Sequence, residues 1–488
     1  TEKFRQHNAT QFFESFTEAS ASTYYLFVGK ATAYTSGTTG GSDSSPPTPS
    51  DSPSDTEFYA WDSMLAAKNV TSSDVTFSIP RRNWVNGTTY DMYDDNISSS
   101  NTATSGASNL YDSTFYFMTS DYRVYKVLDN NGGTAYSGAE PTSESTSPFE
   151  LGGYVLKYMY QITTSEAAKY LTSDFIPVSD DSTVSAAATD GKIESLKVTA
   201  GTGYTNGTYY AAVYGDGTSA GTSSGAIVRI TVSGGTIQSF GLTAGSDTTI
   251  HAGGAGYTFG TVNLASGYTF SDADLTSASA IGGSGGSIEV VISPKNGHGN
   301  SAIAELGGHY VMSATTLTQA ENDDITTSND FRQVGLVVDP TNYGTSTVAT
   351  ASTRRQTFVV KAASVSGTFE VDEKITQATT GAVGKVIEYD STNLILYYYQ
   401  TRFPDVGTDT NGNLTAFSGA NAITGQSSSA SATPDTSNSS TVNGVGFSSG
   451  YANPELAYDS GDIIYVEERS PITRASDQTE NVKLIIEF

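Results

Sequence analysis

Two serines stand in a pattern that could support nucleophilic catalysis. Ser223 and Ser284 each occupy the centre of a G-x-S-x-G motif, which in hydrolases places the serine hydroxyl on a sharp turn between a strand and a helix. Both serines lie in Gly/Ser runs between β-rich segments, and neither run leads into a helical pattern. We therefore expect loops at these positions and predict no catalytic residue.

A second candidate for chemistry is the segment GHGNSAIAELGGH, in which His298 and His309 flank Glu305. Imidazole and carboxylate groups can bind zinc or act as a general base. The spacing differs from H-E-x-x-H, which places two imidazoles on one face of a helix. We therefore favour a short helix with turns at Gly297 and Gly307 over a metal site, and predict no metal ligands.

The segment DVGTDTNGN contains part of a calcium-binding pattern. Asp409, Asn411 and Gly412 would take the third and fifth ligand positions and the turn glycine. Gly407 and Ser418 would then take the first and twelfth positions, and neither residue suits them. We name no calcium ligand here and predict no cofactor.

Arg81, Arg82 and Trp84 in SIPRRNW form the conspicuous basic and aromatic cluster of this acidic chain. Arginine forks bind carboxylates bidentately, and an indole buries a large area, so both residue types are favoured at protein interfaces. The same residues could equally serve inside the chain, as an internal ion pair beside a core tryptophan. Both roles remain open at this stage.

A charged elbow near the end of the sequence presents the same two alternatives. It joins two predicted strands, Ile463–Val466 and Val482–Phe488, and it combines charges of both signs with a rigid proline. Such a turn could fix the register of a neighbouring subunit or brace the chain's own sheet. The candidate interface residues of the elbow are Arg469, Pro471, Arg474, Asp477, Gln478 and Glu480.

The elements that position these residues are predicted to be mostly strands. Asn8 is a reasonable N-cap for a short N-terminal helix whose apolar face comprises Ala9, Phe12, Phe13 and Phe16. Helical spacing also relates Trp61, Met64, Leu65 and Lys68. Strand-like runs occur at residues 23–34, 75–79, 114–118, 122–128 and 154–162, separated by turn-forming residues.

The composition excludes several classes of function. The chain of 488 residues has 24 Lys and Arg against 51 Asp and Glu, a net charge of −27, which repels nucleic acid and anionic membranes. It has no cysteine, so disulfides and thiolate chemistry are excluded. No apolar run is long enough for a membrane span, and we expect a soluble protein made in a cytoplasm. Its 30 tyrosines indicate a folded chain.

Two β-rich stretches interrupt the rest of the sequence. The first contains an internal repeat that pairs Gly191 with Gly235 and VTAG at Val198 with LTAG at Leu242, and the second ends in a long polar stretch. The predicted organisation is a core at 1–183, a Gly/Ser-rich β module at 184–293, core again at 294–356, a second β module with a polar linker at 357–450, and core strands at 451–488.

Five blocks in the same order resemble the gene 8 baseplate wedge family of T-even-type contractile-tail phages. The resemblance covers a little under half of the chain, and the β modules have no counterpart in it. The blocks are TEKFRQHNATQFFESF at 1–16, PPTPSDS at 46–52 with SIPRRNW at 78–84, YRVYKVLDN with GGYVLKYMYQI between 122 and 162, FRQVGLVVDP at 331–340, and the terminal strand, elbow and strand.

The resemblance implies a mainly β fold, a layered β-sandwich core with short helices in loops, here with two small inserted β domains. It also implies a homodimer that joins the wedge with proteins like gene products 10, 7 and 6. The expected place of the protein is the tail baseplate of the virion, after assembly in the host cytoplasm. Host contact would then remodel the baseplate.

Two functions of different classes follow from the sequence. The leading hypothesis is a structural, non-enzymatic wedge subunit that acts through homodimer and wedge contacts. The alternative is a tail adhesin that binds host-surface glycan through its β modules, because tyrosine faces can stack on sugars. Binding of glycan by the 184–293 segment would favour the adhesin.

Overall fold

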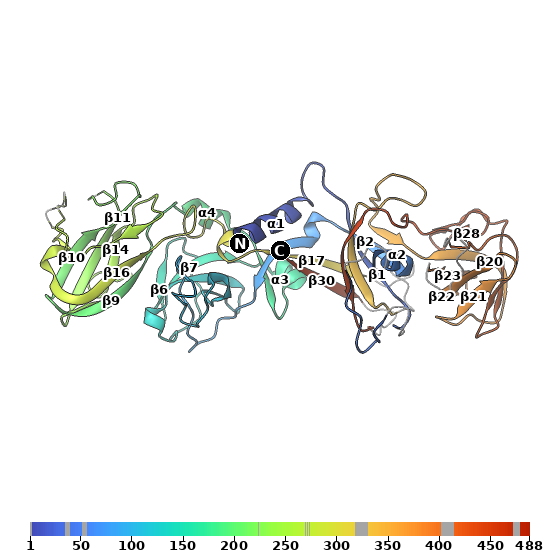
Figure 1. Ribbon diagram of the computed structural model, residues 1–488, viewed down its shortest axis with the longest axis horizontal. Coiled ribbons are helices and arrows are strands. Elements are labelled where there is room, and N and C mark those ends of the chain that lie inside the picture. The colour runs from blue at the N-terminus through green and yellow to red at the C-terminus, as the bar shows by residue number, and fades with distance from the viewer. Residues whose placement is uncertain are drawn as a thin grey trace. The chain divides into compact units, whose positions relative to one another are not determined.

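A computed structural model confirms the predicted mainly β fold with short helices (Figure 1). It describes residues 2–34, 40–50, 56–222, 224–268, 270, 272, 274–317, 330–401, 414–471 and 479–488. The chain forms two compact units. Unit 1 comprises residues 1–11, 76–312 and 485–488, and unit 2 comprises residues 12–75 and 313–484.

The sheet nearest the predicted basic cluster lies in unit 1 and has the order β4-β5-β7-β6. Its strands are antiparallel, with Tyr125 opposite Tyr158 and Lys126 opposite Lys157. Rings from β4, β5 and β7 pack with Tyr90 and Tyr136 into one core. The elements are β4 (Tyr116–Met118), β5 (Arg123–Asp129), β6 (Phe149–Leu151), β7 (Tyr154–Gln161), α3 (Thr164–Tyr170), α4 (Ser182–Ala187) and α5 (Ala302–Glu305).

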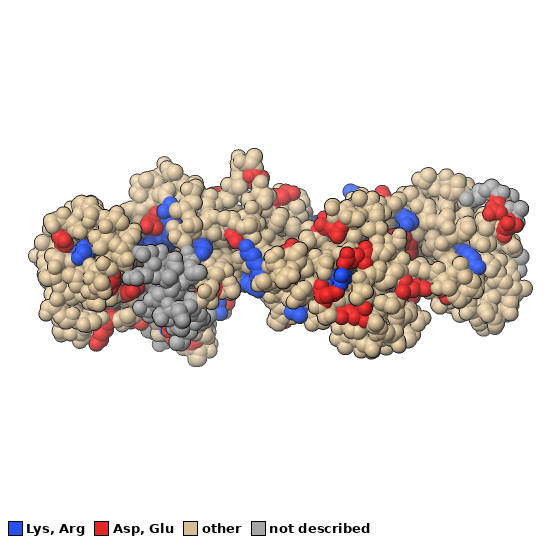
Figure 2. All heavy atoms as spheres, turned by 180° about the vertical axis from the view of Figure 1, so that it is seen from behind, with Lys and Arg blue, Asp and Glu red and all other residues tan. Residues whose placement is uncertain are grey.

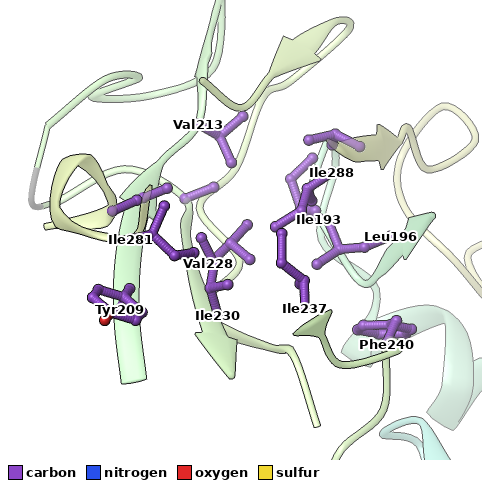
Figure 3. Packing of buried hydrophobic residues seen from close by; sticks show 14 of the residues in the cluster. Ile193, Leu196, Tyr209, Val213, Val228, Ile230, Ile237, Phe240, Ile281 and Ile288 are labelled. Atoms are coloured by element: carbon purple, nitrogen blue, oxygen red, sulfur yellow. The ribbon is translucent and has the colours of Figure 1, made fainter. Parts of the chain in front are cut away.

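The first Gly/Ser-rich stretch of the sequence forms two further four-stranded sheets of unit 1, ordered β10-β12-β13 with β14 on β12, and β11-β15-β16-β9. Val228 and Ile230 of one sheet belong to the same core as Leu196 and Ile288 of the other (Figure 3). The strands are β9 (Ser195–Tyr204), β10 (Gly207–Ala212), β11 (Tyr214–Gly215), β12 (Ile227–Ser233), β13 (Thr236–Ile237), β14 (Thr249–Ala252), β15 (Gly260–Thr261) and β16 (Gly282–Val291).

A fourth sheet has the order β30-β17-β3-β8. Its strands are β3 (Val75–Pro80), β8 (Phe175–Val178), β17 (Tyr310–Leu317) and β30 (Glu480–Glu487). β30 is the second strand predicted at the end of the sequence, and it occupies the edge of this sheet. The boundaries between the two units fall within β17 and β30, at the start of β3 and within α1 (Glu2–Glu14).

Unit 2 contains a five-stranded antiparallel sheet in the order β19-β2-β1-β18-β29. Trp61 on the short helix α2 (Phe58–Ser63) packs with Tyr25, Phe27 and Leu456 in its core. The strands are β1 (Tyr24–Gly29), β2 (Met64–Val70), β18 (Gln333–Val338), β19 (Thr353–Arg355) and β29 (Asp462–Glu468).

Unit 2 also contains a seven-stranded sheet, in the order β23-β22-β21-β24-β25-β20-β28. β23 also pairs with β20, which closes this sheet on itself around its own apolar core. The strands are β20 (Phe358–Ser366), β21 (Lys374–Gln377), β22 (Ala382–Asp390), β23 (Ile395–Tyr399), β24 (Ile423–Gly425), β25 (Ser431–Pro434) and β28 (Tyr451–Ala452), with a small hairpin of β26 (Thr441–Val442) and β27 (Val445–Gly446).

Two predictions about helices were wrong. α1 begins at Glu2, well before the predicted N-cap Asn8, because its first two turns are solvated and show no apolar spacing, and Glu2 favours the helix N-terminus. The helical spacing from Trp61 to Lys68 was misleading, since Met64 starts strand β2. Residues 64–67 are all buried, so they show no alternation.

A buried carboxylate in the first sheet predicts a pH-dependent stability. Asp129 at the end of β5 is buried and accepts a hydrogen bond from the Asn131 N–H at 2.8 Å. Burial raises the pKa of Asp129 from 3.8 to about 6. Between these values the unfolded chain releases its proton first, so the free energy of unfolding falls as pH rises through this window, by about 3 kcal/mol in all.

Asp129→Asn is therefore expected to stabilise unit 1 by about 2–3 kcal/mol at pH 7, since the amide oxygen can still accept from Asn131. The gain should vanish near pH 3, where residue 129 is neutral in both the parent protein and the variant. Urea unfolding at the two pH values measures it. Asp181→Asn is the control, because Asp181 caps α4 and asparagine caps helices equally well. A gain that is equal at both pH values would contradict the explanation.

Candidate assembly interface

The two arginines of the predicted basic cluster follow β3 and bind backbone carbonyls of unit 1. Arg81 donates to the carbonyl of Thr172 at 2.7 Å, and Arg82 donates to that of Tyr111 at 2.7 Å. The Arg82 guanidinium also lies 4.3 Å from the ring centroid of Tyr116, a cation–π contact. These partners are carbonyls and a ring, not the carboxylates that the sequence led us to consider.

Trp84 packs against the aromatic core of the first sheet. Its ring meets that of Tyr136 edge to face, with 5.9 Å between the ring centroids. The backbone N–H of Trp84 donates to the Met118 carbonyl at 2.8 Å. The indole nitrogen has no access to solvent, nor has one guanidinium nitrogen of Arg82. A partner chain could not reach these two atoms, which favours the internal role for both residues. The neighbouring Val85 is 54% exposed.

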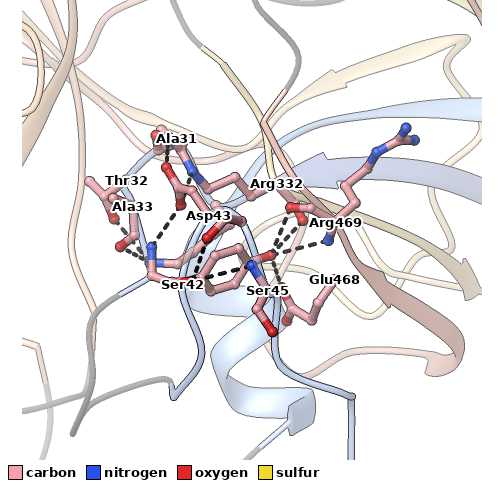
Figure 4. A network of polar contacts seen from close by, with 12 residues as sticks. Ala31, Thr32, Ala33, Ser42, Asp43, Ser45, Arg332, Glu468 and Arg469 are labelled. Carbon is pink, nitrogen blue, oxygen red and sulfur yellow. Dashed lines mark hydrogen bonds and ion pairs between the residues drawn. The ribbon is translucent and has the colours of Figure 1, made fainter.

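The elbow begins in a polar network that ties three distant segments of unit 2 together (Figure 4). The Tyr34 hydroxyl oxygen lies 2.6 Å from a carboxylate oxygen of Glu468 and 2.7 Å from the Arg332 carbonyl, and it accepts from the Arg469 N–H at 3.2 Å. Arg332 donates two hydrogen bonds of 2.9 Å to Asp43. The side chain of Arg469 points away from the network in Figure 4.

Hydrogen bonding and burial shift the pKa values of the charged groups in this network. Hydrogen bonding to Arg332 lowers the pKa of Asp43, so its carboxylate stays ionised. Desolvation raises the pKa of Glu468 and lowers that of Lys30 to about 8. The Lys30 ammonium group nevertheless donates to Thr32 at 3.1 Å and to the Ala33 carbonyl at 3.3 Å. The network therefore braces the chain's own sheet, one of the two roles considered for the elbow.

Part of the predicted elbow can be placed. Arg469 follows β29, Pro471 is partly buried, and Glu480 is buried at the start of β30. The other three candidates, Arg474, Asp477 and Gln478, lie outside the described residues.

Sequence reasoning missed a cluster that joins the two ends of the chain in unit 1. Arg5 on α1 donates to the Phe488 carbonyl at 2.6 Å, and it forms ion pairs with Glu487 and Glu2. The Phe488 N–H donates to the carbonyl of His309 at 3.1 Å. The only signal for this cluster was that the first and last family blocks lie at these two ends.

The predicted His/Glu cluster is divided between two places. His309 belongs to the cluster at the chain ends, while His298 and Glu305 meet around a buried lysine. Lys126 donates to Glu305 at 2.8 Å and to the His298 Nδ1 atom at 2.9 Å. Its ammonium group also lies 3.8 Å from the ring centroid of Tyr93.

The ammonium group of Lys126 therefore occupies the space between the His298 imidazole and the Glu305 carboxylate, where a metal ion would have to bind. Burial and the neighbouring Lys126 lower the pKa of His298 well below 6.5, so the imidazole is neutral and accepts the hydrogen bond. Burial also lowers the pKa of Lys126, and the Glu305 carboxylate opposes that shift. The described residues contain no group of three or more His, Cys, Asp or Glu side chains arranged to hold a metal. α5 confirms the short helix predicted for this segment, and Gly297 and Gly307 have the positive φ angles of turn residues.

Of the two candidate serines and the calcium-like segment Asp405–Asn413, the structure describes only Ser284. Ser284 lies inside strand β16, not on a turn between a strand and a helix. Ser223 and the whole segment Asp405–Asn413 lie outside the described residues.

The charge on the surface agrees with the composition. On the face shown in Figure 2, acidic side chains gather in patches while basic ones are scattered. Among the described helices, none combines the length and apolar character needed to cross a membrane.

The fold and these networks define a β-rich protein whose distant segments are held together by polar contacts. Residues 1–139 match the model of the family described as Bacteriophage T4, Gp8, the family to which the five blocks of the sequence are similar. The first two of the five resembling blocks lie wholly inside the match, and the third begins in it. A comparison with curated proteins found no match.

Proposed function

We propose that the chain is a structural, non-enzymatic subunit of the tail baseplate wedge of a contractile-tail phage. The match of residues 1–139 carries the proposal. Three described contacts support its extension to the rest of the chain, because each joins the matched part to residues beyond it. These contacts are Arg5 with Phe488, Tyr34 with Glu468, and Lys126 with Glu305.

The proposed mechanism is assembly through a homodimer and through contacts with other wedge proteins, those resembling gene products 10, 7 and 6. Rigid internal networks suit such a subunit, since a preorganised surface loses little conformational entropy on binding. Remodelling on host contact requires interfaces that can also separate, and polar rims suit that requirement. We place the protein in the virion tail, after assembly in the host cytoplasm. The five predicted segments, with two inserted β modules in one wedge core, remain part of the proposal.

The test is to mix the purified full-length chain with the other wedge proteins of the same phage and to measure the masses of the complexes by light scattering. We expect a dimer alone and a larger complex in the mixture. A chain that stays monomeric and joins no complex would overturn the proposal.

The loop of the basic cluster is proposed to contribute to an interface through its exposed side chains. Val85 is 54% exposed beside the partly buried Trp84, so its replacement should leave the fold intact. Val85→Arg is expected to weaken dimer or wedge association by about tenfold, because it places a charge in a desolvated contact. Analytical ultracentrifugation measures the dissociation constant.

Val371→Arg is the matched control for this variant. Val371 is 46% exposed in unit 2, in the second β module, and we expect no effect on association there. An unchanged dissociation constant for Val85→Arg in both the dimer and the wedge complex would exclude this loop from the interface.

A further inference from the structure

One face of the first β module carries a row of aromatic side chains. The rings of Tyr214 and Tyr268 lie 5.8 Å apart, and Phe270 stacks on Tyr268 at 5.8 Å. The ring of Tyr210 meets Phe270 at 6.4 Å and His251 at 5.3 Å. These five side chains, which we call the aromatic row, make a continuous series of ring contacts.

The aromatic row borders the hydrophobic core of its module, and Tyr268 packs against that core. Tyr209, Val228 and Ile230 of β10 and β12 are buried between the two sheets. Tyr210 follows Tyr209 in β10, so it points to the opposite face of the same strand. Tyr214 is 43% exposed, and His251 is also exposed. Tyr210, Tyr268 and Phe270 are partly buried, so some of each side chain in the row remains open to a ligand.

The hydroxyl groups separate the tyrosines of this module into two kinds. The hydroxyls of the buried Tyr204 and Tyr257 bind backbone N–H groups, and the Tyr268 hydroxyl donates to the Asn263 carbonyl at 2.8 Å. Tyr210 and Tyr214 make no hydroxyl hydrogen bond to any part of the chain that the structure describes. Their hydroxyls can therefore serve an external partner.

Backbone hydrogen bonds position two residues of the row, and packing positions the ring of a third. Tyr210 donates its backbone N–H to the Thr276 carbonyl at 2.8 Å, and Tyr268 donates its own to the Ser277 hydroxyl at 2.9 Å. The Tyr214 ring lies directly over Gly221, where an added Cβ atom would come within 2.6 Å of it. A backbone and a ring positioned in this way reduce the conformational entropy that is lost on binding.

Polar side chains line the same face. Arg229 stands opposite Tyr210 in the β10 and β12 pairing and opposite Thr249 in the β12 and β14 pairing. Its guanidinium donates to the Thr231 and Thr208 hydroxyls, at 3.1 and 3.3 Å. Flat rings beside unused hydroxyls and a guanidinium group suit a ligand with apolar C–H faces and many hydroxyls.

We propose that the aromatic row with Arg229 binds an oligosaccharide. Pyranose rings present C–H faces to aromatic rings and hydroxyls to the groups between them. Nucleic acid bases could also stack on such rings, but a chain of net charge −27 repels a phosphate backbone. A protein is the competing occupant, because tyrosine and arginine also anchor protein interfaces; failure of the chain to bind any glycan would favour it. The expectation that the sugar belongs to a bacterial surface rests on the proposed function; the binding chemistry does not.

The test is to apply the labelled full-length chain to an array of bacterial lipopolysaccharide and capsular glycans, and to titrate any hit by calorimetry. We expect binding of at least one glycan, and a loss of affinity of about tenfold in both Tyr214→Ala and Tyr210→Ala. Tyr343→Ala is the matched control, since Tyr343 is 42% exposed in unit 2.

Two results would overturn the proposal. One is an array on which the intact chain binds no glycan, and the other is binding that both row variants retain unchanged. Thermal unfolding of each variant verifies that the module is folded. The wedge assembly experiment is independent, so a failure here would leave the proposed function standing.

Discussion

Glu305→Ala is expected to lower the free energy of unfolding of unit 1 by about 3–5 kcal/mol, because it leaves the buried ammonium group of Lys126 without its counterion. The Lys126 side chain is fully buried, at 0% exposure, and the side chain of Glu305 is 3% exposed. The same carboxylate accepts the Gly299 N–H at 2.7 Å, so its removal leaves a backbone donor unsatisfied as well.

A double variant that removes both charges distinguishes the contribution of the ion pair to stability from that of side-chain packing. Lys126→Met with Glu305→Leu is expected to recover much of the lost stability, since well-packed apolar residues can replace a buried ion pair at little cost. Urea unfolding followed by Trp84 fluorescence in a Trp61→Phe background reports on unit 1, because Trp84 lies in unit 1 and Trp61 in unit 2. A double variant no more stable than Glu305→Ala would contradict the counterion explanation.

Glu144→Ala provides the control on an exposed ion pair. Glu144 lies 2.7 Å from Arg123, and its side chain is 51% exposed. Water screens such a pair, so the loss should stay below about 1 kcal/mol. Equal losses for Glu144→Ala and Glu305→Ala would mean that burial does not set the strength of these interactions.

The sequence predicted those strands whose patterns are visible locally. The run from Tyr154 to Ile162 is rich in aromatic and β-branched residues, and it forms β7. Strand β2 was missed because it lies inside its sheet, between β19 and β1, and its first residues are all buried, so the two-residue alternation is absent. The beginning of α1 was missed for the opposite reason, since its solvated turns carry no apolar pattern.

The polar contacts could not be predicted because each depends on residues far apart in the sequence. Lysine is rarely buried, so nothing around Lys126 indicates that it lies inside the protein beside Glu305. Arg469 was identified as part of a structural elbow, but its backbone partner Tyr34 comes from the other end of the chain. Only the order of the family blocks suggested that these segments belong together.

Deleting Ser470–Phe488 is expected to prevent folding or assembly of the chain, the largest effect that we predict. The deletion removes β30 and leaves the backbone groups of β17 exposed at the edge of the sheet. It also removes Glu487 and Phe488, the partners of Arg5. Soluble yield and circular dichroism measure folding. Virions with intact contractile tails built from the truncated chain would contradict the prediction.

A single substitution tests the same strand without removing it. Leu484 on β30 is 5% exposed, so Leu484→Ala is expected to destabilise unit 2 by about 2–5 kcal/mol through the cavity that it leaves. Ile464→Ala on β29 is the control, since Ile464 is 45% exposed and should lose well under half as much. Trp61 fluorescence in a Trp84→Phe background follows the unfolding of unit 2. Similar losses for the two variants would show that β30 contributes no buried contact to its sheet, and the deletion phenotype would then need another cause.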